Sequence, residues 1–218
     1  MSDKLRLRFE KTGRAVYISH LDLMHTMQRA FNRAGLPLKY SEGFNPHPQI
    51  AIALPLSVGT GSLCEIMDFK LKGEANLQEL PERLTAVMPE GIRVLEAYES
   101  ERKSALLKWL EIEGTLEYDH GAPEIGQLEA FFNQGEIVIE KKTKRGIGQA
   151  DIRPAIRSIE FERAGEDIRL HAVISAQEPT LNPDVLPSAL RQLCPELAPD
   201  FAEFTRLETY DAEMRIYR

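Results

Sequence analysis

Two histidines are the residues of this sequence best suited to proton transfer. His20 lies in the first turn of a predicted helix that begins after Ser19, on its apolar side, where free backbone amides favour a neutral imidazole. His47 stands between two prolines, which hold the backbone near an extended conformation. If the rings converge, they and a tyrosine (Tyr17 or Tyr40) would suit metal-free cleavage of RNA by general acid–base catalysis. The alternative for His20 is a ring that only packs over the helix start.

Residues 41–48, Ser-Glu-Gly-Phe-Asn-Pro-His-Pro, have the composition of a rigid polar binding loop. Gly43 permits a positive φ or a close backbone approach, while Phe44 either anchors the loop in the core or stacks on a base. Low backbone freedom reduces the entropy lost on binding. The alternative is a stiff turn between two strands. The candidate substrate-binding residues here are Ser41, Gly43, Phe44, Asn45 and His47, with Arg29 on the polar side of the preceding helix.

Residues 141–157 form a basic stretch in an acidic chain. The stretch has six basic residues and one acid, whereas the whole chain has a net charge of −7. A local patch of this kind attracts a polyanion to one place on an acidic body. The overall charge argues against a general nucleic-acid binder, and no DNA partner is expected. The alternative is a solvated, lysine-protected hairpin tip. The candidate substrate-binding residues in this stretch are Lys142, Lys144, Arg145, Asp151 and Arg153.

The Gly146-Ile-Gly148 sequence inside the basic stretch would allow a phosphate to approach the backbone closely. The guanidinium of Arg153 could then donate two hydrogen bonds to that phosphate. An isolated G-x-G is weak evidence for such a loop. The chain has no phosphate-binding loop, dinucleotide fingerprint or serine nucleophile elbow.

We expect neither a metal nor a cofactor. The two isolated cysteines are too few for an iron–sulfur cluster or a four-ligand zinc site. A metal site made of His20 and His47 with Asp22 or Glu65 is a weak alternative, because Asp22 is expected to cap a helix and no H-x-x-x-H pair is present.

Hydrophobic periodicity predicts alternating strands and helices. Alternating apolar residues predict a strand over residues 5–9, and Ser19 with Asp22 predicts a capping box at the start of a helix that ends at Gly35. Further strands are expected at 38–40, 49–54, 63–71 and 91–98, and a helix at 77–88. The second half predicts strands at 105–118, 136–140, 159–161, 168–175 and 207–217, and helices at 124–133 and within 187–193.

This order of elements indicates an α+β fold made of two tandem ferredoxin-like (split βαβ) subdomains, with antiparallel sheets and the helices on one side. We expect an N-terminal subdomain over residues 1–100, which carries both histidines, and a C-terminal subdomain over residues 105–218, which carries the basic hairpin. The polar residues 100–104 mark the boundary. The N-terminal residues lack the apolar core of a signal peptide, and no apolar stretch approaches the ~20 residues that span a bilayer. We therefore expect a cytoplasmic protein that does not associate with membranes.

Three motifs together resemble the radical-SAM-linked protein family, an uncharacterised bacterial domain. They are Tyr-Ile-Ser-His-Leu-Asp-Leu-Met at 17–24, residues 41–56 with Glu65, and Asp-Ile-Arg-Pro at 151–154. The resemblance covers nearly the whole chain. It implies a domain fused behind, or encoded beside, a radical-SAM protein with a cobalamin-type domain, often near an RNA-processing enzyme of the ribonuclease E/G type. This chain has no radical-SAM catalytic region, so the resemblance implies a stand-alone form with a radical-SAM protein as its partner.

Three functions remain open from the sequence. The first is an accessory module without catalytic activity of its own, which presents RNA (tRNA or rRNA) or another substrate to the radical-SAM partner. The second is a metal-independent enzyme that cleaves or modifies RNA, either with His20 and His47 or, by fold-level analogy with pseudouridine synthases, with Asp151 as nucleophile. The third is a protein–protein adaptor that does not bind RNA.

Overall fold

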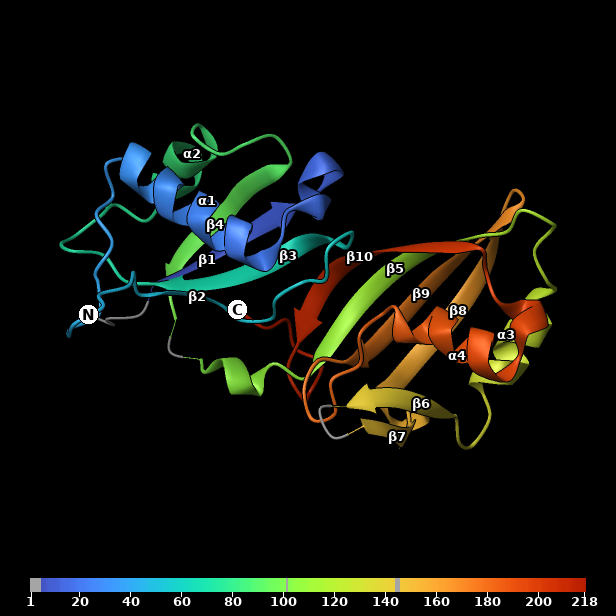
Figure 1. Ribbon diagram of the computed structural model, residues 1–218. Helices are drawn as coiled ribbons and strands as arrows, with labels where there is room; N and C mark the ends of the chain where they lie inside the picture. Colours follow the sequence, from blue (N-terminus) through green and yellow to red (C-terminus); the bar gives the residue numbers. More distant parts are fainter. Residues whose placement is uncertain (1–4, 101, 144–145) are drawn as a thin grey trace. The chain divides into compact units, whose positions relative to one another are not determined.

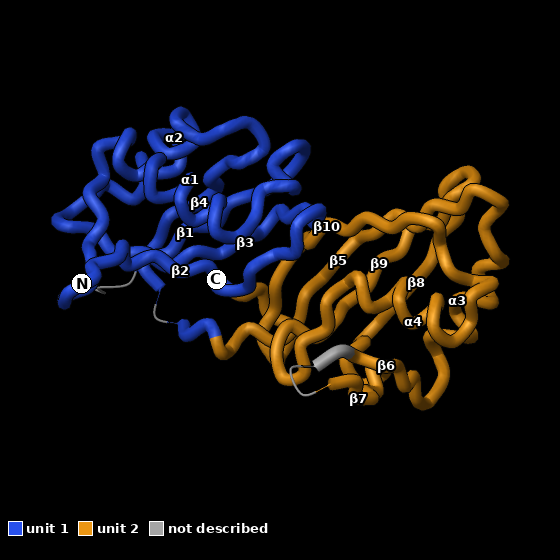
Figure 2. The backbone as a smooth tube through the Cα atoms, in the orientation of Figure 1, with its two compact units in different colours: residues 1–104, 218 blue, residues 105–217 orange. Residues whose placement is uncertain are grey.

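The computed structural model describes residues 5–100, 102–143 and 146–218. The chain divides into two compact units, residues 1–104 with Arg218 and residues 105–217 (Figure 2). Both units combine antiparallel strands with a few helices, so the prediction of an α+β fold is confirmed. None of the helices in the described part of the chain has both the length and the apolar character needed to cross a membrane.

The first unit alternates strands and helices around one sheet. Its elements are β1 (Leu5–Lys11), the 3-10 helix η1 (Gly13–Tyr17), α1 (His20–Arg33), β2 (Ile50–Ile52), β3 (Gly61–Phe69), α2 (Leu80–Thr85) and β4 (Ile92–Glu99). The strands lie side by side in the order β4-β1-β3-β2, and each neighbouring pair is antiparallel. Helices α1 and α2 cover one face of this sheet (Figure 1).

The side chains of β1 alternate between an apolar face and a charged face of the sheet. Leu7 and Phe9 are fully buried in the cluster that also contains Phe31 of α1, and successive strand residues point to opposite faces. Arg6 is therefore on the other face, where its Nε lies 2.6 Å from the carboxylate of Asp68, its register partner on β3. The alternation of β1 thus fixes which face of the sheet receives the helices.

Helix α1 begins and ends as its sequence predicts. Ser19 Oγ accepts a hydrogen bond from the backbone N–H of Asp22 (3.2 Å) and donates to the Asp22 carboxylate (2.7 Å). At the other end Gly35 has φ +65°, and the N–H of Leu36 donates to the Phe31 carbonyl at 2.9 Å, which is the bond of a Schellman C-terminus.

The described residues of the second unit form a four-stranded sheet, two α-helices and a separate hairpin. Its strands and helices are β5 (Trp109–Glu117), α3 (Ile125–Phe132), β6 (Val138–Thr143), β7 (Gly146–Asp151), β8 (Ile156–Ala164), β9 (Asp167–Ser175), α4 (Val185–Leu193) and β10 (Phe201–Tyr210). Short 3-10 helices lie at Ser104–Leu106 (η2), Arg153–Ala155 (η3) and Pro195–Leu197 (η4). The sheet order is β10-β5-β9-β8, and β6 pairs with β7 as the hairpin. Helix α3 packs on the sheet through Phe132, whose ring stacks on Phe161 at 5.7 Å.

The two sheets share one strand order. Without the β6–β7 hairpin, the strands of each unit lie in the order fourth, first, third, second along the chain. In both units the helices follow the first and the third of these strands.

Two predicted elements of the first unit are wrong in type or length. Residues 38–40 form only the isolated bridges of Leu38 with Leu71 and of Tyr40 with Pro48, so they are not a strand. The helix expected over 77–88 is restricted to α2. The side chain of Asn76 accepts from the N–H of Gln78 at 3.1 Å and closes a turn before the helix starts.

The second unit departs from prediction around the hairpin and at the chain end. Strand β7 includes Gly146 and Gly148, which are poor strand formers, so the sequence pattern predicts a loop there instead. The last strand is β10 rather than residues 207–217. It ends because Asp211 Oδ1 accepts from the backbone N–H groups of Glu213 (3.1 Å) and Arg215 (3.0 Å), which turns the chain.

Gly91 is needed where α2 leads into β4. Its φ is +87°, and a Cβ at this position would lie 2.3 Å from the Thr12 carbonyl oxygen. We expect Gly91→Ala to lower the free energy of unfolding by roughly 3 kcal/mol through backbone strain and this clash, as measured by urea denaturation. Gly73→Ala is the control, because Gly73 also has a positive φ but its Cβ would meet nothing within 4 Å. Equal losses in the two variants would contradict the close approach.

Candidate functional site

The 41–48 loop is closed at its base by hydrogen bonds between Ser41 and His47. The N–H of Ser41 donates to the His47 carbonyl (2.9 Å), and the N–H of His47 donates to Ser41 Oγ (3.1 Å). The same hydroxyl lies 2.9 Å from His47 Nδ1. Pro46 and Pro48 restrict the backbone on both sides of the ring. These bonds and prolines hold the loop in one shape.

Phe44 lies in the middle of this loop and packs against nothing. Its relative exposure is 112%, so the alternative in which Phe44 anchors the loop in the core is wrong. Gly43 before it has φ +119°, a conformation that residues with a Cβ rarely adopt. Asn45 after it is exposed as well. The loop therefore presents an aromatic ring to solvent, and stacking on a base stays a prediction.

Cationic side chains lie next to the base of the loop. Lys39 and Lys72 are exposed, and the N–H of Lys39 donates to the Lys70 carbonyl at 2.8 Å, which puts the two segments side by side. The Nζ of Lys72 lies 5.7 Å from the ring centroid of Tyr40, whose hydroxyl accepts from Gln28 of α1 (2.9 Å). The sequence pattern did not predict this group, because its lysines come from separate segments.

His20 lines a small cavity at the start of α1, together with Lys11 and Glu65. Its volume of about 10 Å³ is close to the room that one water molecule needs. Lys11 is 1% exposed, and its Nζ donates to the Val16 carbonyl at 3.0 Å. Burial lowers the pKa of the Lys11 ammonium, and the nearby Glu65 carboxylate offsets part of this effect. His20 Nδ1 is buried and has no hydrogen-bond partner among the described residues.

This polar cluster was only partly visible in the sequence. Lys11 lies two residues after Phe9 and four after Leu7, so it belongs to the same face of β1 as these two buried residues. The sequence pattern missed this because it predicted that the strand ends at Phe9, two residues before Lys11. The cavity has no room for a nucleotide or a sugar ring. What its groups do hold together is the end of β1 and η1, through the bond from Lys11 to Val16.

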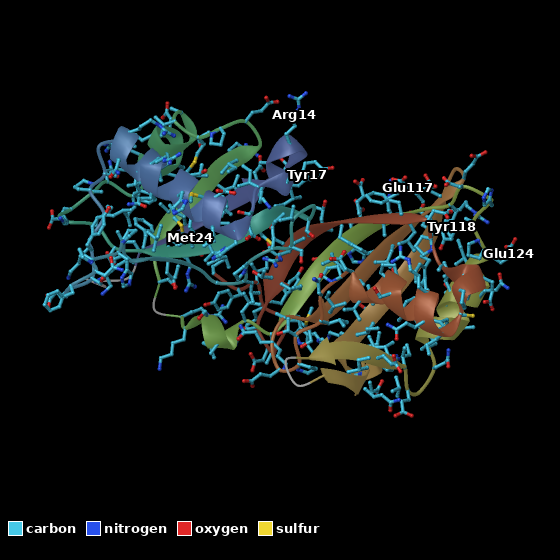
Figure 3. The ribbon with its side chains drawn as sticks, viewed as in Figure 1. Arg14, Tyr17, Met24, Glu117, Tyr118 and Glu124 are labelled. Carbon is cyan, nitrogen blue, oxygen red and sulfur yellow. The ribbon has the colours of Figure 1, made fainter. Side chains whose placement is uncertain are left out.

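The two histidines occupy different surroundings. His47 is exposed in the loop and is not among the residues that line the His20 cavity. Tyr17 is 71% exposed and projects away from η1, as does Arg14 (Figure 3). Within the described residues no group of three or more His, Cys, Asp or Glu side chains is arranged to hold a metal ion. Neither His47 nor a tyrosine lines the cavity that contains His20.

Two of the candidate residues of the second unit, Asp151 and Arg153, have structural partners. Asp151 Oδ1 accepts from the backbone N–H groups of Ile137 (2.9 Å) and Arg153 (3.0 Å). The Arg153 guanidinium donates to the Ile156 carbonyl at 2.8 Å. These bonds join both ends of the β6–β7 hairpin to the chain around it. Lys142 belongs to β6, while Lys144 and Arg145 lie outside the described residues.

A polar network that the sequence pattern did not reveal joins three neighbouring strands of the second unit. Glu111 on β5 is hydrogen-bonded to His171 Nε2 on β9 at 2.9 Å and accepts from the Tyr210 hydroxyl on β10. Burial raises the pKa of Glu111, but the bonds from Tyr210 and His171 outweigh it and lower the pKa below its ordinary value. Such cross-strand pairs stabilise a sheet.

Arg29 is exposed on α1 and borders a shallow groove with Thr26 and Arg33. The groove is open and lies outside the His20 cavity, since the two share no lining residue. Arg33 and Thr26 were not among the predicted binding residues.

Comparisons with known proteins identify a family and a fold. A family model described as "Uncharacterized protein conserved in bacteria (DUF2344)" matches residues 4–183. No curated protein matches the sequence. A chain in the "Crystal Structure of a Cbf5-Nop10-Gar1 Complex" has a TM-score of 0.54 at 13% identity, with 94% of this chain and 48% of that chain covered. The protein thus spans about half the length of that chain, and the likeness concerns the fold alone.

A second solved structure has the same coverage of this chain but a poorer superposition. It is the "Crystal Structure of an Unknown Protein from Galdieria sulphuraria", at 12% identity and a TM-score of 0.27, with 94% of this chain and 99% of that chain covered.

The His20 cavity yields a test of its electrostatics. Because the Glu65 carboxylate raises the pKa of buried Lys11, we expect Glu65→Gln to lower that pKa further, as measured by NMR titration of the Lys11 side chain. Between the pKa of Lys11 in the folded chain and its higher pKa in the unfolded chain, the unfolded chain binds a proton that the folded chain lacks. The free energy of unfolding therefore rises with pH in this interval, and Glu65→Gln widens the interval.

The matched control is Glu10→Gln. Glu10 lies one residue before Lys11 but pairs with Arg93, Nε to Oε1 at 2.8 Å. An unchanged Lys11 pKa in Glu65→Gln, or an equal change in Glu10→Gln, would contradict the proposed coupling.

Proposed function

The chain belongs to the DUF2344 family of uncharacterized proteins conserved in bacteria, and we propose that its first unit is a binding module that presents single-stranded RNA to a radical-SAM partner. The observation that carries the RNA part is the fully exposed Phe44 ring in the hydrogen-bonded 41–48 loop. The partner rests on the resemblance to the radical-SAM-linked family.

An exposed phenylalanine in a rigid loop is suited to base stacking. Single-stranded RNA is recognised through splayed bases that stack on aromatic rings, and each such contact contributes roughly 1–3 kcal/mol. A loop already held by Ser41 and His47 loses little conformational entropy when it binds. Beside the ring, Asn45 and His47 supply hydrogen-bonding groups for base edges and 2′-hydroxyls.

The surrounding charge favours a strand that crosses the loop base. Lys39 and Lys72 lie there on a chain whose net charge is −7. These two lysines attract phosphates locally on a protein whose acidic residues outnumber its basic ones.

The strand order suggests the fold class, and two local observations disfavour the enzyme alternatives. We assign both units to the ferredoxin-like (split βαβ) class, because each has four sheet strands in the order fourth, first, third, second with helices after the first and third. The RNA-cleaving alternative needs His20 at a substrate, but its cavity measures about 10 Å³. The alternative with Asp151 as nucleophile needs a carboxylate that already accepts two backbone hydrogen bonds.

The direct test is Phe44→Ala with a fluorescein-labelled oligouridylate, followed by fluorescence anisotropy. We expect the dissociation constant to rise roughly fivefold or more, since one stacking contact is lost. The matched control is Phe201→Ala, because Phe201 is a 55% exposed phenylalanine on β10. Wild-type affinity in Phe44→Ala, or an equal loss in both variants, would remove the loop as the RNA site.

The partner is tested by affinity purification of the tagged chain from cells at low and raised salt, with sequencing of bound RNA. Recovery of a radical-SAM protein together with RNA that is lost at raised salt supports the module, because phosphate contacts weaken with ionic strength. Recovery of the radical-SAM protein without RNA above background would contradict the RNA-binding module and favour the protein–protein adaptor.

A further inference from the structure

A groove on the first unit joins cationic and apolar side chains. Its volume is about 350 Å³, which falls in the range of small-molecule sites. It is lined by Thr26, Arg29 and Arg33 of α1 and by Val87, Met88 and Pro89, which follow α2. Positions 26, 29 and 33 are three, four and seven residues apart, so they share one face of the helix.

The two arginines differ in what holds them. Arg33 Nη2 donates to the Val87 carbonyl at 2.6 Å, which fixes this guanidinium across the groove and leaves most of its five N–H donors available. Arg29 is exposed and makes no hydrogen bond to the described residues. Within the described part of the chain neither arginine pairs with a carboxylate, although the protein has 34 acidic residues.

Helix stability alone does not account for this pair. Like charges at i and i+4 on a helix repel each other. The helix dipole favours Arg33, which lies in the last turn, but its effect fades beyond that turn, where Arg29 lies. The acid on the same helix, Asp22, is bonded to Ser19 in the first turn. A bound anion would turn this repulsion into a joint attraction.

We propose that this groove binds the phosphate group of a nucleotide. The phosphate lies between Arg29 and Arg33, whose planar guanidiniums match phosphate oxygens in a fork, and the Thr26 hydroxyl donates a further hydrogen bond. Val87, Met88 and Pro89 form the apolar wall against the sugar and base. The proposal does not depend on the 41–48 loop, since the two sites share no residue.

The phosphate has two possible sources, a free mononucleotide or the backbone of an RNA strand. Titration of the whole chain with adenosine 5′-monophosphate tests the first, and titration with the dinucleoside monophosphate ApA, which has a phosphodiester but no terminal phosphate, tests the second. Adenosine without phosphate is the ligand control. We expect adenosine to bind at least about tenfold more weakly than the phosphate-bearing probes, because charge-assisted hydrogen bonds are lost.

Arg29→Gln is the decisive variant, since Arg29 has no partner in the fold to lose. We expect it to weaken binding of the phosphate-bearing probes by about tenfold, while Arg14→Gln, which removes an exposed arginine outside the groove, leaves binding unchanged. Thermal unfolding of each variant verifies that the fold is retained.

The outcomes separate this site from the RNA loop. Dependence on Arg29 for adenosine 5′-monophosphate but not for ApA assigns the groove to a free nucleotide, and dependence for both assigns it to either phosphate source. No measurable binding of either probe, or equal effects of Arg29→Gln and Arg14→Gln, would overturn the proposal. Phe44→Ala distinguishes the two proposals. Loss of adenosine 5′-monophosphate binding in Phe44→Ala but not in Arg29→Gln would assign the nucleotide to the loop and overturn the groove, whereas loss in Arg29→Gln alone supports the groove whatever the result with oligouridylate.

Discussion

The antiparallel pairing of β1 with both β3 and β4 is the constraint on which the first unit depends. Because a central strand has a hydrogen-bonded neighbour at each edge, its side chains point alternately to the two faces of the sheet, and this alternation decides which of them enter the apolar core. Leu7 and Phe9 receive α1 on one face, and Arg6 pairs with Asp68 on the other. The position of α1 follows, and with it the groove and the segment that leads into the 41–48 loop.

The sequence predicts the elements that carry local signals. Ser19 and Gly35 mark the ends of α1 because a side-chain cap and a left-handed glycine act within a few residues. The missed features depend on contacts from distant segments. The burial of Lys11 needs β3 and the start of α1 around it, and strand β7 forms because its partner β6 outweighs two glycines.

In the candidate site, too, the features with a local sequence signal could be predicted and those that depend on distant contacts could not. The proline-bracketed loop could be predicted, because proline restricts its own neighbours, but the solvent exposure of Phe44 could not, since an aromatic residue in a loop packs inward as readily as outward. The convergence of His20 and His47 stays a prediction, and a shared sheet end has not given the two rings a shared cavity, since His47 does not line the one that contains His20. The groove residues Thr26 and Arg33 could not be predicted either, because the groove forms only where Val87, from a distant segment, lies beside them.

The hydroxyl of Ser41 can hydrogen-bond to either neutral tautomer of His47, because a hydroxyl both donates and accepts. If Nδ1 is unprotonated, the hydroxyl donates to it, and Nε2–H is a donor; if Nδ1 carries the proton, it donates to the hydroxyl, and Nε2 is an acceptor. Nε2 has no partner among the described residues, and either tautomer keeps the loop closed. One ring can therefore match a donor or an acceptor on a ligand without any movement of the backbone, which would make the loop tolerant of different bases.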